Sequence, residues 1–386
     1  MNDAAETSNR LPSSTQALEG ITVLDFSHVI AGPFATFHLA ALGARVVKVE
    51  NPAGGDAVRN NPRSFTSFNH GKECLRLDLR KPEDVRTAMG LAAASDVMVD
   101  NMRPGVLARY GLGVAQMRAQ HPRLIHCSIS GYGTAGDWSK RGAYDHVIQA
   151  ASGMAMMSGQ AEDGPIKVGF PVIDCATGIL AAFAIMAALR RRDLTGLGET
   201  IDVSMLGAAM QLMYPMVVET LATGEAPSRR GNVGYSGSPA ADTLTCADGL
   251  LAVGANTPNQ LGKLGDALGI GARMRELLGG QSTGFVTAAR GAEIRQLLVD
   301  AVRDQKVAEL EARLNQAGVA ASQVRNLAES VRDAKRSGAL SPWMLPGDVP
   351  VEVPGLGFKT HGLFGGAPAP SWAKAPGEQQ EPGQQT

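Results

Sequence analysis

The chain has 386 residues, which is long enough to bury a sizeable core and to form two domains. Its 36 basic and 37 acidic residues leave a formal net charge of −1, and aromatic residues make up only 5% of it. Because nucleic-acid binding needs a basic face or a platform of aromatic rings, this composition argues against a nucleic-acid partner.

The first predicted elements form a βαβ unit. Residues 1–17 are polar and are predicted to be a disordered lead. The segment "ITVLDFS" (21–27) is typical of a buried strand, "GPFATFHLAALG" (32–43) of a helix ended by glycine, and "RVVKVE" (45–50) of a second strand. Apolar strands that alternate with a helix indicate a parallel sheet.

The next segments extend this pattern. "DVMVDN" (96–101) and "LIHCSIS" (124–130) predict two more strands, with a helix around residues 85–94 between them. The sequence therefore predicts a large, doubly wound, Rossmann-like α/β domain over residues 18–221. Its later part is expected to be mostly helical, at 147–157, 178–189 and 203–220.

After this domain the composition changes. Residues 222–242 are rich in Gly, Ser, Pro and Arg, which predicts a linker. Alternating strand and helix patterns over residues 243–317 then predict a smaller α/β domain. The Pro-, Gly- and Gln-rich tail is predicted to be unstructured.

The cysteines and the apolar runs limit the kinds of site. Cys74, Cys127, Cys175 and Cys246 lie far apart without metal-ligand spacing, so no metal site is expected. The N-terminus lacks the basic and apolar regions of a signal peptide, and the longest apolar run, residues 178–189, is too short to span a bilayer. We therefore expect a cytoplasmic protein with no membrane partner.

Glu50 ends the second predicted strand, where an acidic residue of a dinucleotide-binding fold binds the adenosine ribose. The turn after the first strand reads "SHVIAGPF", with one glycine and one proline. It lacks the GxGxxG pattern that lets the backbone approach a pyrophosphate. A fixed NAD or FAD site is therefore not expected.

Asp174 stands just ahead of an alanine-rich apolar run that predicts a helix. Seen alone, it fits an N-cap, whose side-chain oxygen accepts hydrogen bonds from the first N–H groups of the helix. The same place also suits a reactive carboxylate, because the positive potential of a helix N-terminus favours the ionised form. The local pattern leaves both interpretations open.

Several segments, in the same order along the chain, resemble the family III CoA-transferases, the group typified by formyl-CoA transferase and crotonobetainyl-CoA:carnitine CoA-transferase. The α-methylacyl-CoA racemases share the same general sequence. The resemblance covers about residues 18–210, and weaker echoes reach about residue 260. The segments are "LEGITVLDFSHVIAGPFATFHLAALGARVVKVENPAGGD", "FNHGKECLRLDL", "VDNMRPGVLARYGL", "PRLIHCSISGYG", "YDHVIQAASGM", "VGFPVIDCATGILAAFAIMAAL" and "GLGETIDVSML".

The resemblance implies that Asp174 is the catalytic carboxylate. It would attack the thioester of a donor acyl-CoA, giving a mixed anhydride and a CoA thiolate that then forms an aspartyl-CoA thioester. An acceptor carboxylic acid would run these steps in reverse. CoA is then a substrate, no tightly bound cofactor is expected, and we favour succinyl-CoA as donor and a small dicarboxylate as acceptor.

The family also implies binding roles for other positions. The backbone of Val29, Ile30 and Ala31 would contact the CoA pantetheine and the thioester, although the same residues could form an ordinary strand-to-helix turn. Lys72 and Arg103 would hold CoA phosphates through charge-assisted hydrogen bonds, which suit exposed cations. The alternative is that both are surface cations without a specific role.

Tyr144 and Gln149 match positions in the wall of the substrate pocket, or they pack with a satisfied polar tip. Racemases have a histidine base where this chain has Tyr144, and His146 would point to a different side of a helix. Since tyrosine is a poor base at neutral pH, a racemase is the weaker alternative, and a non-catalytic CoA-binding protein is a third. Arg229 and Arg230 could bind a second substrate carboxylate or form an exposed linker pair.

The resemblance further implies an interlocked homodimer, in which two chains thread through each other like links. Each chain would join its large and small domains by two long linkers, residues 222–242 and 318–350. Residues 351–386 would then return to the large domain and end in a loose tail.

Overall fold

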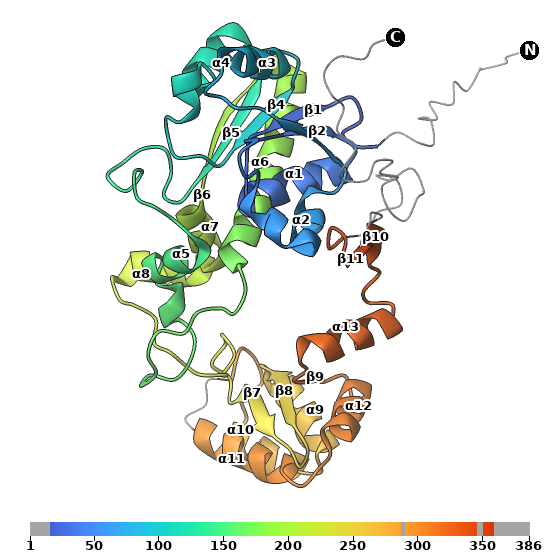
Figure 1. The fold of residues 1–386 in the computed structure, drawn as a ribbon. Coiled ribbons are helices and arrows are strands. Elements are labelled where there is room, and N and C mark those ends of the chain that lie inside the picture. The colour runs from blue at the N-terminus through green and yellow to red at the C-terminus, as the bar shows by residue number, and fades with distance from the viewer. Residues whose placement is uncertain (1–15, 287–289, 346–349, 359–386) are drawn as a thin grey trace, which may run out of the picture. The chain divides into compact units, whose positions relative to one another are not determined.

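The computed structural model describes residues 16–286, 290–345 and 350–358. The chain divides into two compact units. The first comprises Met1–Ala155, Lys167–Ala226 and Ser341–Thr386, and the second comprises Met156–Ile166 and Pro227–Leu340. Figure 1 shows the elements of both units.

The first unit is built on a six-stranded sheet in the order β3-β2-β1-β4-β5-β6, with every pairing parallel. This confirms the predicted parallel α/β architecture. The strand order reverses between β1 and β4, and ligands of such sheets bind outside the carboxyl ends of the strands at that point. The strands are β1 (Thr22–Asp25), β2 (Arg45–Glu50), β3 (Lys72–Arg76), β4 (Val97–Asp100), β5 (Ile125–Ser130) and β6 (Thr200–Ser204).

Helices cover both faces of this sheet. On one face α1 and α6 pack against Val23, Val97 and Ile125, and on the other α3 and α4 pack against Leu24 and Met98. Neighbouring residues of a strand point to opposite faces of the sheet, so a sheet covered by helices on both faces has apolar side chains on both. The continuous apolar runs in the sequence predict this arrangement. The helices are α1 (Ala31–Ala41), α2 (Pro62–Asn69), α3 (Pro82–Ala93), α4 (Val114–Gln120), α5 (Asp145–Ala151), α6 (Val172–Thr195), α7 (Met205–Leu212) and α8 (Tyr214–Thr223).

Helix α6 is long and apolar enough to cross a membrane, judged by length and composition alone. One of its faces is buried against the sheet and α1, through residues spaced three or four apart such as Thr177, Ala181, Ile185 and Ala188. A core helix of this kind passes the same test. The helix therefore carries no argument for a membrane-bound protein.

The second unit contains a three-stranded antiparallel sheet in the order β7-β8-β9. Apolar side chains of four helices, among them Leu261, Leu277, Leu298 and Leu310, form its core. The strands are β7 (Ala240–Thr245), β8 (Leu250–Ala255) and β9 (Ala320–Gln323), and the helices are α9 (Pro258–Ala267), α10 (Gly271–Leu278), α11 (Gly291–Val302), α12 (Val307–Gln316) and α13 (Leu327–Arg336).

Three boundaries differ from the sequence prediction. The range 318–350, predicted as a linker, contains β9, α13 and the strand β10 (Trp343–Leu345). Residues 156–166, predicted as part of the large domain, group with the second unit. The chain rejoins the first unit at Ser341, before the predicted return at 351, because the β10–β11 hairpin packs Trp343 and Leu345 on α1. The strand β11 is Val351–Val353. The predicted lead up to residue 15 and the tail from residue 359 lie outside the described residues.

Candidate active site

Asp174 is the third residue of α6, so the N-cap interpretation is wrong. The helix begins at Val172, and the N-cap residue is Pro171, which makes no side-chain capping bond. Among the residues that the structure describes, the Asp174 carboxylate has no hydrogen-bond or ion-pair partner. The Asp174 side chain therefore does not cap its own helix and is available for another role.

Asp145, the first residue of α5, caps this helix instead. Its Oδ2 accepts hydrogen bonds from the backbone N–H groups of Ile173 at 2.7 Å and of Asp174 at 3.0 Å. A carboxylate at a helix N-terminus is stabilised by the free N–H groups and by the helix dipole. Because these two N–H groups donate to Asp145, they are not free to stabilise negative charge on a bound substrate.

Gln149 holds Asp145 in place. Its Nε2 donates to Oδ1 of Asp145 at 2.6 Å, and its Oε1 accepts from the N–H of Val168 at 2.8 Å. Gln149 is only 1% exposed, and both ends of its amide are used. The structure therefore favours the alternative that Gln149 packs with a satisfied polar tip, beneath Asp145 and not on an open surface.

Tyr144, by contrast, is 68% exposed and directly precedes Asp145. Its place in the wall of the substrate pocket stays a prediction. Its ring stacks on that of His146, with 6.1 Å between the ring centroids and 10° between the planes. The two side chains were expected on different sides of a helix. They meet because Tyr144 is the extended N-cap of α5 and not a helical residue.

Burial and a neighbouring charge change the acidity of Asp174. Its partial burial, and secondarily the negative charge of Asp145, raise the pKa of the Asp174 carboxyl from 3.8 to about 6. The carboxylate is thus less stabilised than an ordinary aspartate and holds a proton more readily. Perturbed groups of this kind concentrate at functional sites.

The turn between β1 and α1 lies against the same helix, one turn after Asp174. A Cβ added to Gly178 of α6 would lie 2.8 Å from the backbone oxygen of Ala31 and 3.2 Å from the backbone nitrogen of Ala35. Only glycine permits this approach. The close contact brings the predicted CoA-binding residues 29–31 to the end of α6 that carries the candidate nucleophile.

Side chains fix the backbone of this turn. The N–H of Ser27 donates to Oδ1 of Asp25 at 2.8 Å. Asn101, just after β4, accepts from the N–H of His28 at 2.9 Å and donates to its carbonyl oxygen at 2.7 Å. Both strands at the reversal of the sheet order therefore hold the turn in one conformation.

Lys72 does not have the exposed position that a phosphate contact needs, so that prediction is wrong. Its ammonium is buried, 3.1 Å from Oδ2 of Asp25, and also donates to Asn69 and to the carbonyl of Pro33, both at 2.9 Å. Burial lowers the pKa of Lys72 to about 8, although the charge of Asp25 opposes the shift. Burial would raise the pKa of Asp25, but Lys72, Lys48 and hydrogen bonds lower it to about 2.

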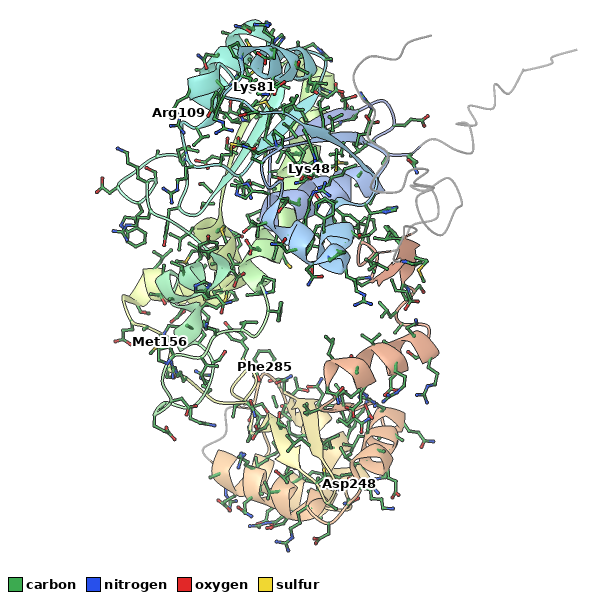
Figure 2. All side chains as sticks on the ribbon, in the orientation of Figure 1. Lys48, Lys81, Arg109, Met156, Asp248 and Phe285 are labelled. Atoms are coloured by element: carbon green, nitrogen blue, oxygen red, sulfur yellow. The ribbon has the colours of Figure 1, made fainter. Side chains whose placement is uncertain are left out.

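Arg103 fits its prediction better. It is exposed just beyond β4, and no ion pair engages it within the described part of the chain. Figure 2 shows two further basic residues, Lys81 and Arg109, at the edge of this unit, whereas Lys48 lies among its strands. The phosphate-binding role of Arg103 stays a prediction.

In the second unit, the Arg229 guanidinium donates to backbone oxygens of residues 156–166, including Met156 and Gly164, both at 2.8 Å. This engagement argues against its use for a substrate carboxylate. Arg230 is exposed. No group of three or more His, Cys, Asp or Glu side chains that could hold a metal ion occurs within the described ranges.

Sequence reasoning missed Asp145 and the support that it receives from Gln149. The only signal was their spacing of four residues in "DHVIQ", which places two side chains on one face of a helix. Nothing in the sequence links either of them to residues 168 and 173, which come from a distant part of the chain.

Comparison with known proteins identifies the family of the chain. A family model described as CoA-transferase family III matches residues 18–380. A succinate–glutarate CoA-transferase of Agrobacterium fabrum is 32% identical over 302 residues, which are 75% of each chain. A succinyl-CoA:glutarate CoA-transferase of Mus musculus is 36% identical over 64% of this chain, but the match spans only 58% of the mouse protein. A succinyl-CoA:mesaconate CoA-transferase of Haloarcula hispanica is 36% identical over 62% of this chain and 64% of its own length.

Solved structures show the same architecture. A CAIB/BAIF family protein from Brucella suis is 30% identical, with a TM-score of 0.73 over 85% of this chain and 89% of that one. A protein of Mycobacterium tuberculosis designated Rv3272 is 26% identical, with a TM-score of 0.79 over 91% of this chain and 95% of that one. Since a family model covers nearly the whole sequence and related enzymes align over most of it, the chain belongs to CoA-transferase family III.

Proposed function

We propose that this chain moves CoA from an acyl-CoA donor to a carboxylic acid, with Asp174 as the covalent relay. The observation that carries the proposal is a half-buried carboxylate without a partner among the described residues, at the end of α6 next to the β1–α1 turn. Its raised pKa leaves it ionised at neutral pH but weakly stabilised, which suits a nucleophile.

The reaction has four balanced steps. An Asp174 oxygen attacks the donor thioester carbon, the carbon–sulfur bond breaks, and CoA thiolate leaves a mixed anhydride behind. The thiolate attacks the aspartyl carbonyl and releases the donor acid, which leaves CoA on Asp174. The acceptor carboxylate then displaces the thiolate to form a second anhydride. The thiolate finally attacks the acceptor carbonyl, which frees Asp174.

We propose small dicarboxylates as the acids, with succinyl-CoA as the donor. Support comes from relatives whose names specify succinate and glutarate, succinyl-CoA and mesaconate, or acetyl-CoA and oxalate. The test is a panel of CoA esters against mono- and dicarboxylic acids, read by mass spectrometry of the product esters. A strong preference for monocarboxylic acids would contradict this assignment.

The covalent step has a direct test. Incubation with acyl-CoA should add the mass of CoA less one water to the protein, as a thioester on Asp174. Hydroxylamine should then release CoA and leave a hydroxamate at Asp174, and borohydride should release CoA and leave an alcohol there, so either product marks the residue. Asp174→Asn should bind CoA and form no adduct. As a matched control, Asp163→Asn changes an acidic residue of the second unit and should form the adduct as the wild type does.

The same incubation separates the alternatives. A racemase would exchange the α-proton of an acyl-CoA for deuterium without forming an adduct, and a binding protein would do neither. The exposed tyrosine at position 144, where racemases have their histidine base, favours transfer over proton exchange.

We also propose a cytoplasmic homodimer, interlocked as the family resemblance implies. Supporting this, large apolar side chains stay exposed on α6, at Ile179 (53%) and Phe183 (70%), and on α8, at Tyr214 (59%) and Leu221 (81%). Apolar side chains one turn apart on a helix surface, such as Ile179 and Phe183, are of the kind that a subunit interface would cover, which supports the proposal. Light scattering should give twice the chain mass. Tagged and untagged dimers should not exchange subunits until they are unfolded, since threaded chains cannot separate while folded.

A further inference from the structure

Val29 has a backbone conformation that its side chain disfavours. Its φ is 68°, and it is the only non-glycine residue with a positive φ in the part of the chain that the structure describes. A β-branched residue in this left-handed region is a clear outlier, because its Cβ crowds the backbone. Such a conformation persists only where the surroundings hold it in place.

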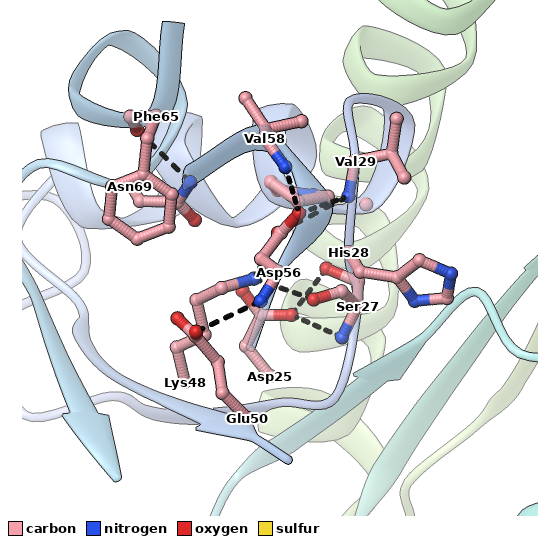
Figure 3. A network of polar contacts seen from close by, with 12 residues as sticks. Asp25, Ser27, His28, Val29, Lys48, Glu50, Asp56, Val58, Phe65 and Asn69 are labelled. Carbon is pink, nitrogen blue, oxygen red and sulfur yellow. Dashed lines mark hydrogen bonds and ion pairs between the residues drawn. The ribbon is translucent and has the colours of Figure 1, made fainter. Parts of the chain in front are cut away.

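Asp56 supplies that hold. Its two carboxylate oxygens lie 3.1 and 3.2 Å from the backbone nitrogen of Val29, which donates to them, and Oδ1 also accepts from the N–H of Val58 at 3.1 Å. Figure 3 shows these contacts converging on the Asp56 side chain. The carboxylate is completely buried. It therefore fixes the direction of the Val29 N–H without competition from water.

Lys48, on β2, completes the arrangement. Its ammonium lies 3.1 Å from Oδ2 of Asp56 and also donates to the carbonyl oxygen of Ser27 at 2.6 Å. The buried pair thus holds the backbone on both sides of His28 (Figure 3). An unpaired charge at this depth would be strongly unfavourable, so each member needs the other.

Glu50 fixes Asp56 in turn. Its Oε2 accepts from the N–H of Asp56 at 3.1 Å and pairs with Arg59 at 2.6 Å. The acidic residue at the end of β2 therefore has a structural role in this chain that does not involve a ribose. It connects the second strand of the sheet to the turn after the first.

We propose that Asp56, with Lys48 as its counter-charge, is a positioning residue for the transfer reaction. It holds Val29 in the left-handed conformation, so that residues 29–31 present their backbone to the acyl-CoA thioester beside Asp174. This inference rests on the proposed function. Asp56 has no part in bond making. It acts through the shape of the turn.

A buried ion pair alone is weak evidence for stability, because apolar residues of similar size can replace it without loss. Positioning makes a different prediction. If Asp56 holds Val29 against its steric preference, a glycine at position 29 should need Asp56 less, since glycine adopts a positive φ freely. A purely structural role for Asp56 predicts that the two positions couple in Tm alone, because contacting residues couple in stability, and that glycine at position 29 restores no kcat/KM.

The test is a double-mutant cycle with Asp56→Asn, Val29→Gly and both together. Asp96→Asn is the matched control, because Asp96 also accepts a backbone N–H, from Thr22 at 2.8 Å, and pairs with a cation, Arg192 at 2.9 Å. It differs in place, since Thr22 begins β1 whereas Val29 follows its end. For each variant, kcat and KM for acyl-CoA, the rate of adduct formation on Asp174 and Tm are measured.

Asp56→Asn should lower kcat/KM by about tenfold to about a hundredfold, as displaced binding groups do. Adding Val29→Gly should recover part of that loss, and Asp96→Asn should lower Tm while kcat/KM stays within about twofold of wild type. Losses that simply multiply in the double variant, or a fully active Asp56→Asn, would overturn the proposal.

If Asp56→Asn does not fold, the test uses Val29→Gly and Val29→Ala, each made in the protein that keeps Asp56. The positive φ predicts a higher Tm for glycine than for alanine, and the reverse order would overturn the proposal. Wild-type protein that forms no adduct would contradict the proposed function instead. Titration of CoA into wild type and Asp56→Asn would then still report whether Asp56 positions the turn, and equal affinities would count against it.

Discussion

The backbone N–H of Asp174 donates to the carboxylate of Asp145 at 3.0 Å, so the helix that carries the candidate nucleophile is capped by a second acid from another helix. The arrangement leaves the Asp174 side chain without the capping bond that its position suggests. It also keeps a negative charge nearby, which adds to the effect of burial on the pKa of Asp174. One carboxylate thus caps the helix, and the other, the candidate nucleophile, stays without a partner among the described residues.

This division predicts the pH dependence of transfer. Asp174 must be ionised to attack, and its pKa is raised to about 6, so the rate should fall as the pH drops through about 6. Asp145→Asn removes the nearby charge, and the acid limb should move to lower pH. The variant should also lose stability, by about 1–3 kcal/mol, because the new amide N–H₂ faces the donating Nε2 of Gln149.

The measurement is kcat/KM for acyl-CoA across the acid range, with Asp304→Asn as the control. Asp304 lies in the second unit and its side chain is 87% exposed, so this control should leave the limb in place. A limb that stays fixed in Asp145→Asn would show that the two carboxylates do not interact as described.

Asp174 should destabilise the folded protein at neutral pH. Because its pKa is higher in the folded state than the ordinary 3.8, the folded protein binds the proton more tightly than the unfolded chain does. The tighter proton binding stabilises the folded state. This stabilisation is complete below the unfolded pKa and is lost as the pH rises through about 6. Asp174→Asn cannot ionise, so at about pH 7.5 it should be more stable than wild type by about 1–2 kcal/mol.

Urea unfolding of both proteins at acid and neutral pH tests this point. The difference should shrink toward zero as the pH falls below the unfolded pKa of 3.8, where the wild-type carboxyl is protonated in both states. A variant that is less stable than wild type at neutral pH would mean that the carboxylate has stabilising contacts in solution. The covalent role would then need a different basis.

The sequence allowed the architecture to be predicted and Asp174 to be chosen as the candidate nucleophile, but not the contacts around that residue. Apolar runs indicated the parallel sheet, because strands covered on both faces need apolar residues on both sides. The cap from Asp145, the burial of Lys72 and the fixed turn at Val29 all join residues from separate segments. Such contacts follow from the order of the strands, which no local pattern specifies. The burial of Lys72 could not be predicted, because its ion-pair partner Asp25 is distant in sequence.

Gly178 should be essential to the approach of α1 and α6. A methyl group there would meet the backbone of Ala31 and Ala35, so Gly178→Ala should cost about 1–3 kcal/mol of stability and lower the transfer rate. Gly90 is the matched control, because it lies in α3 with no atom within 4 Å of an added Cβ. Gly90→Ala should gain about 0.5–1 kcal/mol. The stability of each variant is measured from its unfolding curve and its transfer rate as kcat. Equal changes in stability and in kcat for the two variants would contradict the close contact.

Arg229 should hold residues 156–166 within the second unit. Two separate nitrogens of its planar guanidinium donate to the backbone oxygens of Met156 and Gly164, whereas a lysine has all its donors on one nitrogen at the end of a flexible chain. Arg229→Lys should therefore lose about 1–3 kcal/mol of local stability. Limited proteolysis should cut residues 156–166 faster in this variant, whereas Arg230→Lys, a change of the exposed neighbour, should leave the cleavage rate unchanged. If Arg229→Lys resists the protease as well as wild type does, the arginine does not secure this segment. The choice between a structural and a substrate-binding role would then fall back on a comparison of KM values for mono- and dicarboxylic acids.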